Sequence, residues 1–204
     1  HRLNRNYAGL CAQVDLAIGQ ILHSLELSGQ AENTIIVFTS DHGEQMGSHS
    51  LFGKGVLYEE SVRVPLLMHI PFRQTRQIPV ANPVSHIDLV PTLLELMGRK
   101  PSPGELPGED LLAYVNGRKR RNDHVFIEWH TPKSGPNARA VVSPDGWKLG
   151  LYDTDSSLLF HRHEDPLEMQ NQYYRNPSAP TVRRLRREIE TWQQSASDRQ
   201  PLPA

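Results

Sequence analysis

The spacing of hydrophobic residues changes along the chain, and the first half alternates between helical and strand patterns. Apolar residues recur at steps of three and four over residues 7–25, which predicts an amphipathic helix that ends at Gly29. Residues 34–38 form a continuous β-branched and aromatic run, which is typical of a strand buried on both faces of a parallel sheet, and residues 66–70 are predicted to be another buried strand. Helical spacing returns over residues 87–97. We therefore expect an α/β fold here, with part of a mixed, largely parallel sheet and flanking helices.

The second half of the chain favours short strands and turns. Apolar residues spaced three and four apart over residues 182–192 predict a last helix, whose stripe can cover one face of a small antiparallel sheet. Asp145 and Gly146 are suited to a hairpin turn within that sheet. The polar, Pro-rich tail from Gln193 onward is expected to be frayed. Four runs are predicted to be strands: residues 125–129, 138–142, 147–151 and 158–161.

Residues that stop regular structure are concentrated between the two halves. Glycine and proline recur from Gly98 to Gly108, which is typical of a linker. We therefore assign residues 1–98 to an α/β domain, residues 99–110 to a linker and residues 111–204 to a small C-terminal α+β subdomain. Within the first of these, His86 and Asp88 are interpreted as residues that cap or pack the helix that follows.

The residues directly after the run 34–38 are suited to holding a cation. Ligands of open α/β sheets collect beyond the carboxyl ends of the strands, which is where Asp41 and His42 fall. A carboxylate and an imidazole on a turn that leaves a strand can both reach one metal ion. The alternative is an ordinary polar turn. The oxygens of Asp41 suit Ca²⁺ or Mg²⁺ and the imidazole of His42 also suits softer metals, so these two residues do not decide the metal.

Two further candidates follow on the same loop. Lys54 is bracketed by Gly53 and Gly55, so its loop could fold back over the cation site. A sulfate or phosphate ester gains negative charge on its oxygens as it reacts, and a fixed ammonium beside a metal would stabilise that charge. The alternative is a surface lysine. His49 is either a group that faces a substrate or a loop histidine that bonds to backbone.

Several motifs together resemble the sulfatase family of the alkaline-phosphatase-like superfamily. The resemblance covers residues 7–98 and continues more loosely into the C-terminal part. It rests on Asn33-Thr34 before the strand and on four pieces after it: residues 40–43 (SDHG), 47–49 (GSH), 53–55 (GKG) and 58–65 (YEESVRVP).

The resemblance implies a role for each candidate residue. In sulfatases the aspartate and its Asn or His neighbour ligate one divalent cation, usually calcium, with Mg²⁺ or Mn²⁺ as possible substitutes here. The downstream lysine contacts the sulfate group. Carried over by position, the metal ligands are Asp41 and His42, the sulfate contact is Lys54, and His49 is a candidate catalytic residue. Residues 1–98 then correspond to the C-terminal part of the sulfatase catalytic domain.

One part of the sulfatase pattern is missing from these 204 residues. Sulfatases attack with a formylglycine made from Cys or Ser in a C-x-P-S-R-like motif, and they bring further metal carboxylates from a strand near the N-terminus. The one cysteine, Cys11, has no Pro or Arg at the required spacing and fits the apolar face of the first helix, so a buried thiol is expected. We expect the nucleophile to be encoded before His1 or lost, and this segment alone to be inactive.

Charge and composition restrict the partners. The 22 Lys and Arg against 23 Asp and Glu give a formal net charge of −1, which does not suggest a nucleic-acid surface. No apolar run approaches the ~20 residues of a membrane span, so a soluble protein is expected, with its compartment open because a signal peptide could precede His1. The expected partner is a small-molecule or carbohydrate sulfate ester. Bare strand edges could also lead to self-association.

Three functions remain open at this point. The favoured one is a segment of a sulfuric ester hydrolase. A phosphonate monoester or phosphodiester hydrolase of the same superfamily needs a similar cationic pocket, and relative rates on the two ester classes distinguish them. The third is a non-catalytic remnant, which the presence or absence of the nucleophile motif would identify.

Overall fold

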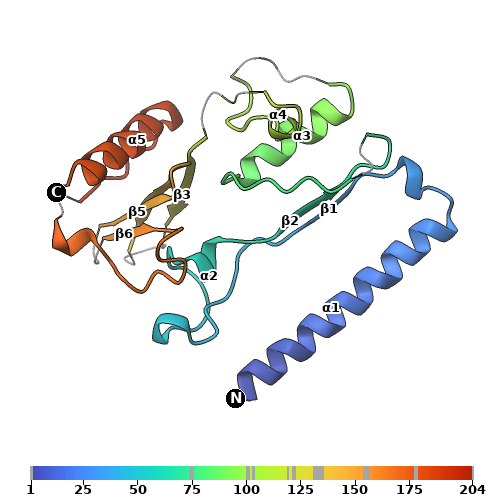
Figure 1. Cartoon of the computed structure of the whole chain (residues 1–204), viewed down its shortest axis with the longest axis horizontal. Helices are drawn as coiled ribbons and strands as arrows, with labels where there is room; N and C mark the ends of the chain where they lie inside the picture. The colour runs from blue at the N-terminus through green and yellow to red at the C-terminus, as the bar shows by residue number, and fades with distance from the viewer. Residues whose placement is uncertain are drawn as a thin grey trace. The chain divides into compact units, whose positions relative to one another are not determined.

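The computed structural model describes residues 2–73, 76–99, 102, 104–118, 120, 123–130, 136–153, 157–176 and 179–203 (Figure 1). The chain divides into two compact units, residues 1–77 and residues 78–204. The linker expected over residues 99–110 stays a prediction, and its Lys100, Pro101 and Pro103 lie outside the described residues. Among the described helices, none is both long and apolar enough to cross a membrane.

The first unit begins with a long helix, α1 (Arg2–Leu27), drawn in blue in Figure 1. Gly29 follows it with a φ of +70°, and its N–H donates to the carbonyl of Glu26, so the predicted C-terminal glycine is confirmed. Much of the apolar stripe of α1 is exposed, including Tyr7, Leu10 and Val14, and Cys11 is exposed with it. The expectation of a buried thiol is therefore wrong for Cys11, although Ile18, Leu22 and Leu25 on the same helix are half-buried.

The two strands of the first unit are β1 (Ile36–Thr39) and β2 (Leu66–His69), and they pair antiparallel. Phe38 lies opposite Leu67, and these side chains are 40% and 63% exposed. All strand pairs among the described residues are antiparallel, so the largely parallel sheet and its doubly buried strands are not observed. A continuous apolar run favours a strand that is buried on both faces, but it does not by itself fix the strand direction.

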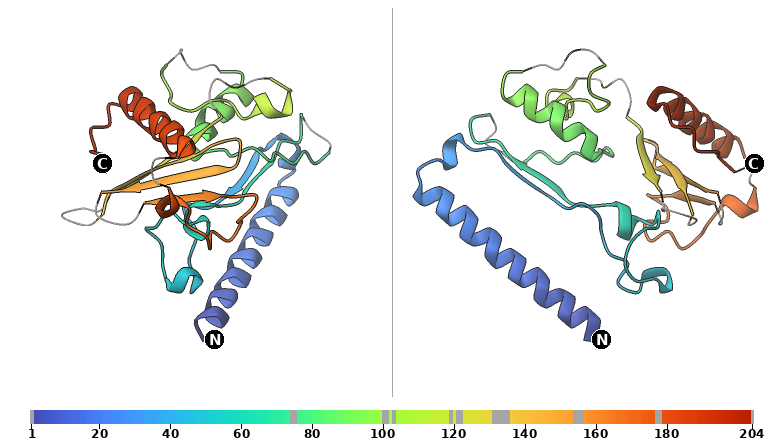
Figure 2. Two further views of the ribbon diagram at one scale, coloured as in Figure 1. Left: turned by 60° about the vertical axis from the view of Figure 1, so that its left-hand side comes forward. Right: turned by 180° about the vertical axis from the view of Figure 1, so that it is seen from behind.

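The second unit is built on a four-stranded antiparallel meander, β3-β4-β5-β6 (Figure 2). Its hairpin turn has Gly146 at φ +91°, with the N–H of Ser143 donating to the carbonyl of Trp147 at 2.8 Å. The predicted antiparallel sheet is confirmed, with each strand within one residue of its expected bounds. The strands are β3 (Val125–Trp129), β4 (Ala138–Val142), β5 (Trp147–Tyr152) and β6 (Leu158–His161).

The last helix, α5 (Pro180–Ala196), covers one face of this sheet as its apolar spacing predicts. Its stripe joins the sheet in one core, made of Val141, Leu149, Leu151, Leu159, Val182, Leu185 and Ile189. Three helices are shorter than α1 and α5: α2 (Glu59–Val62), α3 (Leu89–Leu96) and α4 (Leu112–Val115). Single 3₁₀ turns lie at Ala31–Asn33, Ser48–Ser50, His86–Asp88 and Tyr173–Arg175.

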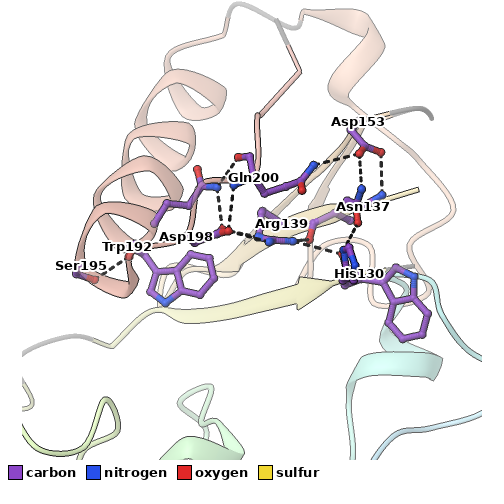
Figure 3. Close-up of polar contacts among 11 residues, drawn as sticks. His130, Asn137, Arg139, Asp153, Trp192, Ser195, Asp198 and Gln200 are labelled. Atoms are coloured by element: carbon purple, nitrogen blue, oxygen red, sulfur yellow. Dashed lines mark hydrogen bonds and ion pairs between the residues drawn. The ribbon is translucent and has the colours of Figure 1, made fainter. Parts of the chain in front are cut away.

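The tail after α5 is anchored, contrary to the expected fraying. Arg139 on β4 donates two hydrogen bonds to the carboxylate of Asp198, at 2.6 and 3.0 Å (Figure 3). Gln193 donates to Asp198 at 2.9 Å and Gln200 donates to Asp153 at 3.2 Å. The Arg139 guanidinium holds the pKa of Asp198 well below its usual range, so this carboxylate stays charged. The polar tail is thus tied to the sheet by a bidentate ion pair.

Candidate metal and anion site

The turn after β1 fixes the side chain of Asp41 by local bonds. The N–H of His42 donates to Asp41 Oδ1 at 2.9 Å, and the Ser40 hydroxyl lies 3.3 Å from the same oxygen. These contacts leave Oδ2 for another partner, and the side chain of Asp41 is 82% exposed. The backbone N–H of His42, more than the imidazole charge, lowers the pKa of Asp41 below its ordinary value. Asp41 is therefore an ionised, accessible carboxylate that could bind a cation.

The ring of His42 is oriented by its neighbour. Its Nδ1 lies 2.8 Å from the carbonyl oxygen of Gly43. A carbonyl only accepts, so Nδ1 carries the proton and a neutral ring presents a lone pair at Nε2. That Nε2 lies 3.3 Å from Asp41 Oδ2. Two electron-rich atoms face each other here, and a cation or a proton on His42 would stabilise them.

Asp41 and His42 form an incomplete set of ligands for a metal such as Ca²⁺. Within the ranges that the structure describes, no group of three or more His, Cys, Asp or Glu side chains could hold a metal ion. Calcium takes six to eight oxygen ligands, so further ligands would come from water, substrate or another segment. The donor types and the free lone pairs still fit a divalent cation.

Lys54 is exposed and follows a loop that closes on the same motif. The N–H of Gly53 donates to Glu44 Oε1 at 2.6 Å, and the N–H of Gln45 donates to the carbonyl of Gly53 at 2.9 Å. The Gly53 N–H is the main cause of a lowered pKa at Glu44, and the charges of Lys54 and His42 lower it further. Lys54 and His42 are thus both within electrostatic range of one carboxylate.

His49 lies at the far end of this loop and is largely covered by aromatic and acidic side chains. Its ring stacks on Tyr58 with centroids 3.8 Å apart, and its Nε2 lies 3.7 Å from Glu60 Oε2. The side chain is 11% exposed. The geometry places His49 against the α2 segment, while its assignment as a catalytic residue stays a prediction.

The glycine of the motif is required by close packing against α2. The N–H of Gly43 donates to the carbonyl of Ser61 at 2.8 Å. A Cβ at Gly43 would lie 1.9 Å from the carbonyl oxygen of Glu60, so a side chain there would displace the backbone. The turn that carries Asp41 and His42 is therefore packed closely against α2.

Three residues of this site were not singled out by the sequence. Glu44, Tyr58 and Glu60 contact Gly53 or His49, and each lies in or beside a motif already quoted for the resemblance. The spacing of Glu44 from Gly53 follows neither a helical nor a strand period, so only the structure reveals the contact.

Comparison with known proteins places these motifs in a family. The sequence model of the Sulfatase family matches residues 2–99. The uncharacterized sulfatase YidJ of Escherichia coli (strain K12) is 38% identical over 165 residues, which is 78% of this chain and 31% of that protein. Arylsulfatase K of Canis lupus familiaris is 35% identical over 179 residues, 81% of this chain and 32% of that protein. The chain spans about a third of the length of these relatives.

Solved structures agree on the fold. The putative sulfatase yidJ of Bacteroides fragilis aligns with a TM-score of 0.83 at 28% identity, covering 96% of this chain and 43% of that one. A protein solved with its substrate D-glucosamine-2-N,6-O-disulfate aligns at 0.74 and 28% identity, over 92% and 40% of the two chains. A phosphonate monoester hydrolase of Agrobacterium radiobacter aligns at 0.70 and 25% identity, over 94% and 40%. The chain belongs to the sulfatase family, with an alkaline-phosphatase-like fold.

Proposed function

We propose that this chain is a segment of a sulfuric ester hydrolase that supplies two metal ligands and a sulfate-binding lysine. Asp41 and His42 would hold one divalent cation, most often Ca²⁺, with Mg²⁺ or Mn²⁺ as alternatives, and Lys54 would contact the sulfate group. The observation that carries this proposal is the facing pair of Asp41 Oδ2 and His42 Nε2, 3.3 Å apart at the end of β1. The relatives with sulfatase names support the assignment.

The chemistry of these side chains suits sulfate ester cleavage. When bound, the cation would act as a Lewis acid on an ester oxygen. The ammonium of Lys54 opposes the negative charge that grows on the sulfate oxygens in the transition state. The Gly43 carbonyl accepts from His42 Nδ1, and in this neutral tautomer Nε2 carries the lone pair that a ligand role needs. His49 is the remaining candidate catalytic residue, next to Tyr58 and Glu60.

The nucleophile would come from outside these 204 residues. A formylglycine is expected in an N-terminal segment, because Cys11 lacks the motif and lies on α1. The chain on its own is therefore expected to be inactive and to hold metal weakly, since Asp41 and His42 would supply two ligands and Ca²⁺ normally takes six to eight. Among the described residues the β1–β2 sheet has two strands, and Phe38 and Leu67 on it are exposed, which would favour self-association of the isolated segment.

The names of similar proteins suggest the class of substrate that we propose here. The substrate printed for one solved neighbour is a sulfated glucosamine, which favours a sulfated carbohydrate here. The second candidate function is hydrolysis of phosphonate monoesters or phosphodiesters. It is favoured by the likeness to the Agrobacterium hydrolase and by 27% identity to the multifunctional alkaline phosphatase superfamily protein PehA of Trinickia caryophylli.

Turnover on paired substrates tests this proposal. In the complete enzyme, which we define as a protein uniting this chain with the formylglycine-bearing segment, an aryl sulfate is expected to be hydrolysed with a higher kcat/KM than a matched aryl phosphonate. Activity should be lost on chelation and return with Ca²⁺, because the cation would stabilise the transition state. A higher kcat/KM on the phosphonate would favour the second function. Turnover that survives exhaustive chelation would contradict the metal-dependent assignment.

A further inference from the structure

We propose that Glu44 is a positioning residue for Lys54: its carboxylate holds the loop so that the lysine stays at a fixed place relative to Asp41 and His42. The inference rests on the proposed function, since Lys54 needs a defined place only if it contacts an anion. Glu44 itself would not touch the substrate.

The contacts of Glu44 join the two ends of the loop. One carboxylate oxygen, Oε1, accepts from the N–H of Gly53 at 2.6 Å and from the N–H of Met46 at 3.3 Å. Gly53 directly precedes Lys54, and Glu44 is two residues beyond His42. A single side chain therefore links the backbone beside the metal-ligand pair to the backbone beside the lysine.

Other backbone hydrogen bonds also hold the loop that contains Glu44 and Gly53. The N–H of Gln45 donates to the carbonyl of Gly53 at 2.9 Å, and the N–H of Gly47 donates to the carbonyl of Leu51 at 2.8 Å. Gly43, just before Glu44, is fixed against Ser61. The backbone on both sides of Glu44 is thus held by hydrogen bonds, and the bonds that its carboxylate accepts are charge-assisted.

Lys54 depends on such an anchor because of its neighbours. Gly53 and Gly55 have φ of +82° and +93°, so both flanking residues are in a region that glycine enters freely and other residues avoid. The Lys54 side chain is exposed. A displacement of about 1 Å at a charged group that contacts a transition state can cost about 100-fold in rate. Fixing Gly53 removes the freedom that would allow such a displacement.

The test compares two substitutions at Glu44 in the complete enzyme. Glu44→Ala removes the acceptor and is expected to lower kcat/KM for an aryl sulfate by about 100-fold. Glu44→Gln keeps an oxygen acceptor for both N–H groups without the charge, and is expected to stay within about tenfold of the parent. The loss in Glu44→Ala should appear mainly in kcat, because positioning acts in the transition state. Glu32→Ala, on an exposed 3₁₀ turn of the same unit, is the matched control and should match the parent.

A second measurement does not depend on turnover. Amide hydrogen exchange at Gly53 should be faster in Glu44→Ala than in the parent and close to the parent in Glu44→Gln. Parental turnover in Glu44→Ala, an equal loss in Glu44→Gln, or unchanged exchange at Gly53 would each overturn the positioning role. If the parent enzyme does not hydrolyse sulfate esters, the proposed function fails by itself. The exchange result then still decides whether Glu44 fixes the loop.

Discussion

Replacing Lys54 by alanine is expected to lower kcat/KM of the complete enzyme for an aryl sulfate by about 100- to 1000-fold. One preorganised donor to a developing oxyanion typically contributes roughly 2.7 to 4 kcal/mol to the transition state. The free energy of unfolding should change by less than ~0.5 kcal/mol, because Lys54 is exposed on a Gly-flanked loop. Steady-state kinetics and urea unfolding of both proteins measure the two effects.

Two variants control this experiment. Arg73→Ala removes another exposed cation of the same unit and should change neither quantity appreciably. Lys54→Arg keeps the charge but spreads it over a planar guanidinium, so it should restore only part of the lost rate. Near-parental turnover in Lys54→Ala would remove this residue from the site.

The second large effect concerns stability and arises at Asp88 in the C-terminal unit. Asp88 Oδ1 accepts from Arg120 at 2.7 Å and from the N–H of Glu109 at 2.9 Å, and Oδ2 accepts from the N–H of Ser85 at 3.1 Å. The side chains of Asp88 and Arg120 are 4% and 6% exposed. Asp88→Ala would leave the Arg120 charge buried without its partner. We expect a loss of roughly 3–5 kcal/mol in the free energy of unfolding.

The matched control is a nearby ion pair that is more exposed. Arg118 donates to Asp110 at 2.7 Å, and its side chain is 54% exposed. Arg118→Ala should cost only about 0–1 kcal/mol. If Asp88→Ala does not fold, Asp88→Asn, which keeps an oxygen acceptor but loses the charge, allows the comparison. A loss no greater than that of Arg118→Ala in the milder variant would show that the buried pair contributes little.

The C-terminal sheet was predictable from sequence because its evidence is local. Each strand is a short apolar run between turn residues, and the Asp145-Gly146 turn fixes one hairpin. Asp88 completes a capping box with Ser85 at the start of the 3₁₀ turn His86–Asp88, although its side chain makes no cap bond on α3 itself. Its partner Arg120 could not be foreseen, because it lies far along the chain in a polar stretch. The prediction of a frayed tail was wrong for the same reason, because Arg139, which binds Asp198 of the tail, is on a strand far away in the sequence.

In the first unit the sequence predicted where the strands lie but not how they pair. The apolar runs identified β1 and β2, but they could not show that the two strands pair antiparallel with Phe38 and Leu67 exposed. The order of residues placed Asp41 and His42 after a strand, and the structure brings their side chains within 3.3 Å. The hydrogen bond between Glu44 and Gly53 closes a loop without a periodic sequence pattern. The spacing of residues therefore could not predict this contact.

The metal site is the central claim, and its position can be measured directly. Crystals of the complete enzyme grown with Mn²⁺ should show one anomalous peak at a coordination distance, about 2.0–2.6 Å, from both an Asp41 oxygen and His42 Nε2. The same peak should be absent, or much weaker, in crystals of Asp41→Ala. A fully occupied metal peak that contacts neither Asp41 nor His42 would contradict the account.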